Sequence, residues 1–313
     1  MSDCKVPASY RAHLALRPQY VAAASVVRRT QSAARAVPPP GLLVVSILSV
    51  QLGSATAKGL FHALGPTGAV FLRIFIGALL LFVIQRPRWR GHSRDDYLSA
   101  AALGVAIAIM NLAFYAAISR LPLGMAVTVE FVGPLAVAVA GSLRRLDLLW
   151  GALAAFGVIL LAPIGGASFD SIGILLALVA AAGWAGYILL NVRVGRAFSG
   201  GTGLSVAMLI SALAVLPLGV GTIAPILAHP RLLAIGAAVA ILSAVIPFSL
   251  EHAALKTLPA RVFGVLMSGE PAIAALVGAI FLGETLGIRG LIALACVSAA
   301  TAGSAGFRGK SGP

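Results

Sequence analysis

The chain has 313 residues, of which 60% are hydrophobic and 10% are charged, and its mean hydropathy is +1.02. Soluble domains carry about 25% charged residues, so this composition excludes a water-soluble globular protein and indicates an integral membrane protein. The formal net charge of +14 does not indicate nucleic-acid binding, because the basic residues form neither an amphipathic stripe nor a patch interleaved with aromatic residues.

Residues 1–40 form a basic, alanine-rich leader that ends in three prolines, and we predict that it is disordered and cytoplasmic. The first apolar run starts near residue 41 and no evident small-residue cleavage site follows it, which predicts a retained membrane span rather than a signal peptide. Cys4 and Cys296 form no CxxC pattern, so we expect neither a disulfide framework nor a metal site.

The rest of the chain divides into apolar segments close to the ~20 residues that a helix needs to cross a bilayer. Short loops with Gly, Pro and charged residues separate them. Helices satisfy their backbone hydrogen bonds internally, as lipid requires, so we predict an all-α integral membrane fold of ten transmembrane helices. The predicted spans are 42–61, 67–85, 97–118, 123–142, 147–163, 172–191, 202–222, 231–250, 261–282 and 286–306.

Lys and Arg are distributed unevenly between alternate loops. Most of them lie in the leader and in the segments that would share its side of the membrane. Few fall on the opposite side, and one, Arg73, lies within a span. Because cytoplasmic loops carry the excess of positive charge, both termini are predicted to be cytoplasmic.

Residues 115–134 resemble residues 252–271 when the two segments are aligned without gaps: an Ala-Ala pair, a Leu-Pro pair and a later proline coincide. Further on, Asp147 matches Glu284 as an acid near the start of a helix. Each half then contains five helices, and an odd number inverts the second half, as in secondary transporters. The predicted domains are a first repeat over 41–166, a second over 167–307 and a cytoplasmic tail, 308–313.

Two glutamates stand within the apolar segments, Glu130 before Pro134 and Glu270 before Pro271. Charged side chains within a segment of bilayer length are costly, and they are usually functional or paired. Each proline leaves a backbone carbonyl without its helical donor, which favours a shared central cavity. Either carboxylate could take up a proton or contact a substrate ammonium. The alternatives are an ion pair with Arg73 or Lys58, or a carboxyl kept neutral by burial.

Other polar and aromatic side chains in the apolar segments are weaker candidates for the translocation path. Arg73 could bind a substrate carboxylate, with an ion pair or snorkelling as the alternative. Helix packing and interfacial belts explain the aromatic and amide groups about as well as substrate contact does. Glu251, beside His252, could relay protons or simply be solvated. The full candidate set adds Gln51, Asn111, Tyr115, Trp184 and Tyr187.

No Walker loop, HExxH or GxSxG motif is present in the sequence, so we expect neither ATP drive nor hydrolase chemistry. The predicted protein is not an enzyme and needs no cofactor. Its expected partners are a small amino acid or metabolite, protons and the lipid bilayer, with no nucleic acid, and it would act as a monomer or homodimer. A non-transporting membrane protein is the less favoured alternative.

Four segments resemble the drug/metabolite transporter superfamily with EamA domains: "NLAFYAAISRLPLGMAVTVEFVGPLAVAV", "RRLDLLWGALAAFGVILLAP", "GWAGYILL" and "IPFSLEHAALKTLPARVFGVLMSGEPAIAALVGAIFLGETL". More narrowly, they are similar to its threonine/homoserine exporter branch in bacterial inner membranes. The resemblance implies ten helices in two repeats and proton-driven efflux of small amino acids. Fold likeness fixes a mechanism class better than a substrate, so efflux of another metabolite or a cationic drug stays an alternative.

Overall fold

The computed structural model describes residues 39–87, 91–140, 145–160, 170–198, 201–247, 250 and 267–306. Helices are the only regular secondary structure in these ranges. They are α3 (Pro39–Lys58), α4 (Phe61–Gln85), α5 (Arg94–Ile118), α6 (Leu123–Glu130), α7 (Val132–Ala140), α8 (Arg145–Leu160), α9 (Ser171–Ala197), α10 (Thr202–Gly219), η1 (Val220–Thr222), α11 (Ile223–Ala228), α12 (Pro230–Ala240), the π-helix η2 (Ile241–Val245), α15 (Glu270–Leu282) and α16 (Ile288–Gly306).

Five stretches of helix in the described residues are long and apolar enough to cross a membrane: Gly41–Lys58, Phe61–Gln85, Arg94–Ile118, Ser171–Ala197 and Thr202–Ala228. Five shorter apolar helices accompany them: Leu123–Val137, Leu148–Leu160, Pro230–Val245, Glu270–Leu282 and Ile288–Gly303. Each predicted span overlaps one of these ten. The all-α membrane fold is therefore confirmed, although length alone supports only half of the predicted crossings.

Large apolar side chains point outward on several helices, among them Leu79, Leu148, Leu213 and Ile280, each more than half exposed. Large contiguous apolar surface is rare on a soluble monomer. In a bilayer the same side chains face hydrocarbon, so they add no cost. The exposed surface thus agrees with the membrane class that the composition predicts.

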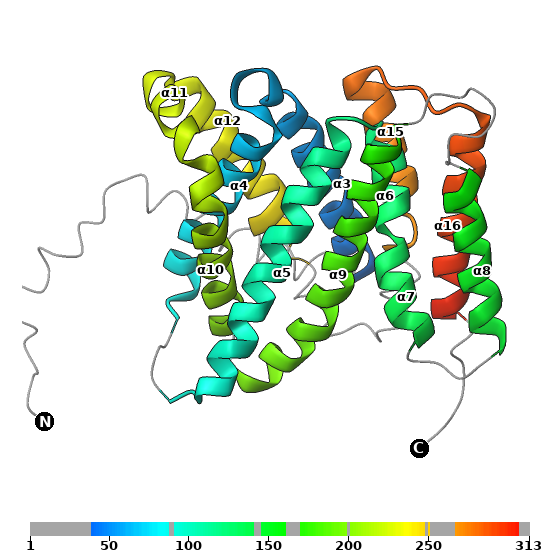
Figure 1. Cartoon of the computed structure of the whole chain (residues 1–313), viewed down its shortest axis with the longest axis horizontal. Helices are drawn as coiled ribbons and strands as arrows, with labels where there is room; N and C mark the ends of the chain where they lie inside the picture. The colour runs from blue at the N-terminus through cyan, green and yellow to red at the C-terminus, as the bar shows by residue number, and fades with distance from the viewer. Residues whose placement is uncertain are drawn as a thin grey trace, which may run out of the picture. The chain divides into compact units, whose positions relative to one another are not determined.

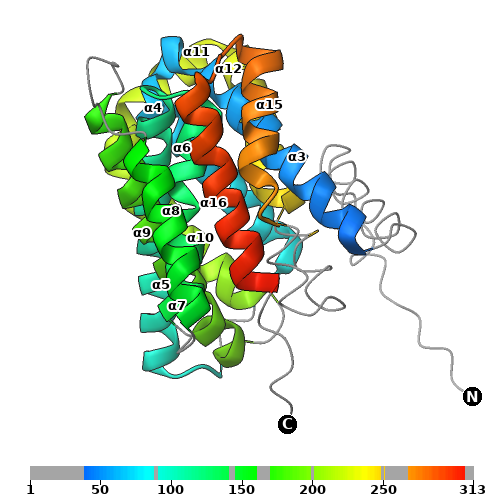
Figure 2. The ribbon, with the colours of Figure 1, turned by 90° about the vertical axis from the view of Figure 1, so that its right-hand side faces the viewer.

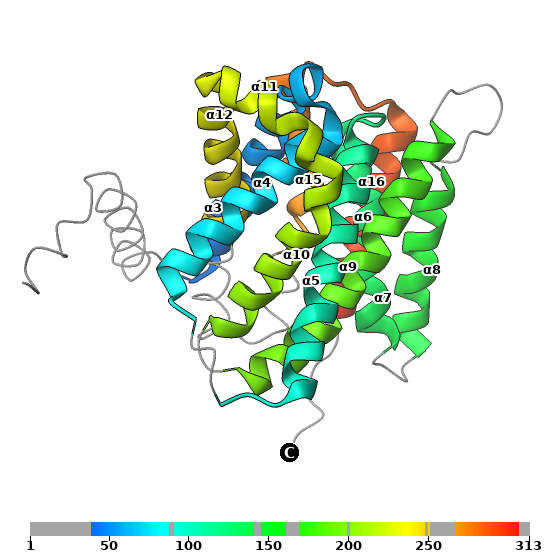
Figure 3. The same cartoon turned by 60° about the vertical axis from the view of Figure 1, so that its left-hand side comes forward.

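The helices pack as neighbours across the chain rather than strictly in sequence order. α5 lies along α9, α10 packs against both α4 and α5, and α8 pairs with α16 at one edge (Figure 1). The view in Figure 2 brings the α8–α16 pair forward. Figure 3 brings the left-hand side of Figure 1 forward and shows α4 and α10 there. α3 contacts both α15 and η2, two elements from late in the sequence.

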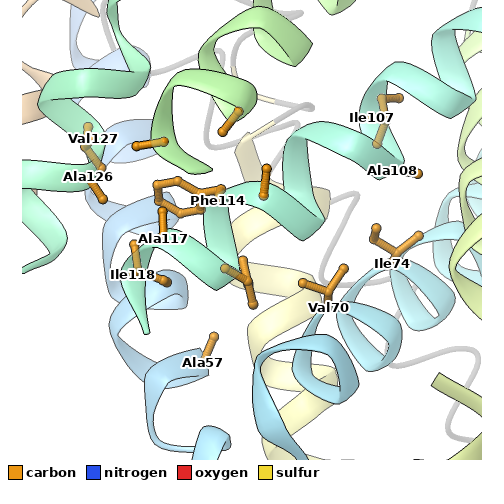
Figure 4. Packing of buried hydrophobic residues seen from close by; sticks show 14 of the residues in the cluster. Ala57, Val70, Ile74, Ile107, Ala108, Phe114, Ala117, Ile118, Ala126 and Val127 are labelled. Carbon is orange, nitrogen blue, oxygen red and sulfur yellow. The ribbon is translucent and has the colours of Figure 1, made fainter. Parts of the chain in front are cut away.

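Small residues allow the helix backbones to approach closely, as is common in membrane bundles. A Cβ at Gly133 of α7 would fall 2.0 Å from the Ala181 carbonyl oxygen of α9, and one at Gly104 of α5 would fall 2.5 Å from that of Ala207 of α10. Between these contacts the core is filled by aliphatic and aromatic side chains from α3, α4, α5 and α6 (Figure 4).

Candidate functional site

The helix that carries Glu130 is interrupted where the sequence places proline. α6 ends at Glu130 and α7 begins at Val132, with Phe131 in a turn between them. Pro134 has no N–H to give to the Glu130 carbonyl, which explains the break. The Glu130 side chain is only 7% exposed, so this carboxyl lies inside the bundle, not on its lipid face.

Glu270 is the first residue of α15, whereas the predicted span 261–282 places it inside a helix. Ser268 and Gly269 form a turn before it, and Pro271 occupies the first turn of the helix. Proline suits that place because its missing N–H would have no helical partner there. A carboxylate at a helix N-terminus is also favoured by the helix dipole. The Glu270 side chain is 6% exposed.

The two glutamates lie at similar depth because α6 and α15 pack together in opposite directions. A Cβ at Gly124 would fall 2.6 Å from the Ala275 Cα, whereas Gly278 faces Leu123. Measured from the first contact at ~1.5 Å per residue, Glu130 lies ~9 Å and Glu270 ~7.5 Å further along the two helices. The structure thus places both carboxyls on the same level of the bundle.

Gln51 of α3 is one partner of Glu270: its Nε2 donates a hydrogen bond to Glu270 Oε1 at 3.0 Å. The Gln51 side chain is 1% exposed, and its own Oε1 has no partner among the described residues. An amide in this position donates a hydrogen bond to the buried carboxyl group without adding a charge. This contact joins the two predicted repeats across 219 residues of sequence.

Arg73 of α4 is held by one residue of η2. Its Nε donates to Ser243 Oγ at 2.7 Å and its Nη2 donates to the Ser243 carbonyl oxygen at 2.8 Å. The guanidinium carbon also lies 5.5 Å from the ring centroid of Tyr115 in α5. Within the described ranges Arg73 forms no direct ion pair with a carboxylate.

The structure places three of the remaining predicted residues in local or packing contacts. Asn111 Nδ2 donates to the Ile107 carbonyl of its own helix at 2.7 Å, which uses that group locally. Trp184 packs edge-on against Phe131, with 5.0 Å between the two ring centroids. Tyr187 is partly buried against the core. Glu251 lies outside the described residues.

A polar network at one end of the bundle was not predicted. Lys58, the last residue of α3, pairs with Glu284 in the α15–α16 connection and donates to the Leu121 carbonyl at 3.2 Å. Glu284 Oε2 accepts the Leu123 N–H at 2.6 Å. Nothing in the sequence pairs Lys58 with Glu284, which lie 226 residues apart.

A second ion pair ties the α5–α6 loop to α9. Arg120 Nη1 donates to Asp170 Oδ2 at 2.7 Å, and Asp170 Oδ1 caps α9 by accepting the N–H groups of Ile172 and Gly173. Ser243 was also missed, because a serine in an apolar run carries no signal of its own. Only the folded chain brings it to Arg73.

Comparison with known proteins agrees with this architecture. Residues 171–305 match the EamA-like transporter family. The threonine/homoserine exporter RhtA of Escherichia coli (strain K12) is 43% identical over 269 residues, which cover 85% of this chain and 90% of the relative. The protein of the same name from Salmonella typhimurium (strain SL1344) is 42% identical over 84% of this chain and 90% of its own length.

A protein of known crystal structure shares the fold, with a TM-score of 0.57 at 18% identity over 84% of this chain and 96% of the other. With its apolar helices, its buried polar groups and these relatives, the chain is a multi-pass membrane protein that belongs to the EamA-like transporter family.

Proposed function

We propose that this protein exports small amino acids of the threonine and homoserine type across a bacterial inner membrane, by proton-coupled alternating access. One observation carries the proposal: 43% identity to a threonine/homoserine exporter over 85% of the chain. The match to the transporter family over residues 171–305 includes Glu270. The excess of basic residues on one side supports cytoplasmic termini.

The buried polar groups are of the kinds that a zwitterionic solute needs. Glu130 and Glu270 supply carboxyl groups at one level of the bundle, and Arg73 supplies a guanidinium without a direct carboxylate partner in the described part of the chain. A carboxyl at this depth can exchange a proton as the cavity changes access. Two inverted repeats of five helices, as the sequence predicts, would provide the rocking motion.

The test is uptake of labelled threonine and homoserine into inside-out vesicles that contain the protein, with and without a proton gradient. We expect accumulation that depends on the gradient and disappears with a protonophore. A passive channel would equilibrate the solute without accumulating it. Folded protein that moves neither amino acid under any gradient would overturn the proposed substrate class.

Efflux of an organic cation is the second candidate, and the two buried glutamates on one level favour it. The same vesicles distinguish the two functions. Competition of threonine uptake by unlabelled amino acids, and not by a lipophilic cation, supports the amino-acid exporter. Gradient-driven uptake of the cation alone supports the alternative.

A further inference from the structure

Ser243 holds the Arg73 guanidinium from two directions at once. Its hydroxyl accepts from Arg73 Nε at 2.7 Å and its carbonyl accepts from Arg73 Nη2 at 2.8 Å. The same hydroxyl donates to the Val239 carbonyl one turn earlier, at 2.6 Å. The hydroxyl is therefore fixed as an acceptor toward Arg73, and the plane of the guanidinium is fixed with it.

The backbone around Ser243 is itself unusual. Residues Ile241–Val245 form a π-helix, in which the N–H of Ile246 donates to the Ile241 carbonyl. Such turns displace the regular helical bonding and occur frequently at functional sites. In this π-turn the Ser243 carbonyl accepts a hydrogen bond from the Arg73 side chain. In a regular α-helix each carbonyl is bonded to an N–H four residues later along the axis, so it is less available to a side chain.

α3 packs closely against this turn from a third side. A Cβ at Gly53 would fall 2.8 Å from the Ser243 Cβ, so only glycine leaves the present spacing. Ser49 Oγ donates to the Leu242 carbonyl at 2.6 Å. The π-turn is thus clamped between α3 and α4, and Ser243 has little freedom to move away from Arg73.

Arg73 keeps N–H groups that its bonds to Ser243 do not use. A guanidinium carries five N–H groups, and Ser243 accepts from only two nitrogens, Nε and Nη2. Tyr115 lies beside Arg73, whose guanidinium carbon is 5.5 Å from its ring centroid, and the Tyr115 side chain is buried next to both Arg73 and Ser243. A buried hydroxyl next to a guanidinium can donate to the same anionic acceptor as the guanidinium does.

We propose that Ser243 is a positioning residue that orients Arg73, so that the remaining guanidinium N–H groups and the Tyr115 hydroxyl bind the carboxylate of the transported solute. This inference rests on the proposed amino-acid export and adds the group that the site recognises. A planar guanidinium matches a carboxylate in a way that a lysine ammonium does not. The bonds to it are charge-assisted and hence strong.

The experiment compares wild-type protein with Ser243→Ala in the vesicle assay, using labelled threonine and unlabelled threoninamide as competitor. Threoninamide keeps the ammonium and hydroxyl but lacks the carboxylate. In wild-type vesicles we expect threoninamide to compete weakly. In Ser243→Ala we expect the KM for threonine to rise about tenfold, with a smaller change in maximal rate, and the preference for threonine over threoninamide to shrink.

Arg73→Lys and Tyr115→Phe should also reduce the preference for the carboxylate. Ser211→Ala is the matched control, because Ser211 is a fully buried serine of α10 whose hydroxyl has no partner among the described residues. We expect it to leave both the KM and the preference unchanged. An unchanged KM and preference in folded Ser243→Ala would overturn the inference.

A second measurement separates this inference from the proposed export. Purified wild-type protein is heated with a panel of amino acids and their amides, and the rise in Tm is recorded. Stabilisation by the acids and not by the amides, lost in Ser243→Ala but kept in Ser211→Ala, supports the carboxylate site even if vesicles show no threonine transport. Equal effects of acids and amides on wild-type protein would contradict it.

Discussion

At the residue scale, the contact between Gln51 and Glu270 makes a sharp test of proton coupling. Glu270→Gln removes the ionisable group but leaves a side chain of the same shape that can still bond to the Gln51 amide. We expect folded protein that exchanges threonine across preloaded vesicles but no longer accumulates it in response to a proton gradient. Full gradient-driven accumulation by the variant would remove Glu270 from the coupling, and Glu130→Gln provides the parallel test.

A close helix contact gives a prediction about stability at the same scale. In Gly133→Ala the new methyl group would meet the Ala181 backbone at 2.0 Å, and backbone cannot rotate away. We expect unfolding to become easier by about 1–3 kcal/mol, as for other overpacked sites. Gly186→Ala is the control, since its nearest neighbour, the Ala106 Cβ, would lie 3.9 Å away.

Gly186→Ala should be neutral or stabilising by up to about 1 kcal/mol, because alanine is the better helix former. Thermal denaturation of the two purified variants in one detergent measures the difference. Equal Tm values for Gly133→Ala and Gly186→Ala would show that α7 and α9 do not approach as closely as described.

At the scale of one element, the start of α9 depends on a single carboxylate. The hydrogen bond from Arg120 and the N–H groups of Gly173 and Ile172 hold the pKa of Asp170 below its ordinary value of 3.8. Because the folded pKa is lower than the unfolded one, this carboxylate stabilises the protein above pH 3.8 and loses its effect as the pH falls through the folded pKa.

We therefore expect Asp170→Asn to lower the Tm near neutral pH. On further acidification the Tm of the variant should fall less than that of the wild type. Asn keeps an oxygen for the helix cap but loses the charge that attracts Arg120. Tm measured from pH 7 down to about pH 3 checks this. Asp95→Asn, in the exposed first turn of α5, is the control, and an identical pH profile for both variants would refute the role of Asp170.

At the scale of the whole molecule, the Lys58–Glu284 pair and its bonds to Leu121 and Leu123 join three connections at the end predicted to face outward. If the protein works by alternating access, these contacts must break for the solute to leave. Removing the pair should therefore favour the state open at this end.

Lys58→Met removes the charge and all its hydrogen bonds but keeps the apolar length of the side chain. In a background without Cys4 and Cys296, we expect a cysteine at buried Ala55 to react faster with an impermeant maleimide when Lys58 is replaced. A cysteine at exposed Ala63 should react equally in both backgrounds. Unchanged labelling at position 55 would mean that the pair does not hold this end closed.

The sequence by itself determined the membrane class, the approximate helix positions and the burial of Glu130 and Glu270. Each depends on local composition, because an apolar run of bilayer length forms a helix and a proline interrupts or starts a helix close to its own position. The start of α15 at Glu270 was missed, because the apolar pattern continues through the Ser268–Gly269 turn and hides it.

Only the tertiary structure decided which polar groups meet. Gln51 reaches Glu270 across 219 residues, Arg73 reaches Ser243 across 170, and Lys58 reaches Glu284 across 226. No local pattern encodes such pairs, because they depend on which helices become neighbours and how each one is rotated. That choice is made by packing of the whole bundle, where small residues set how closely the backbones approach.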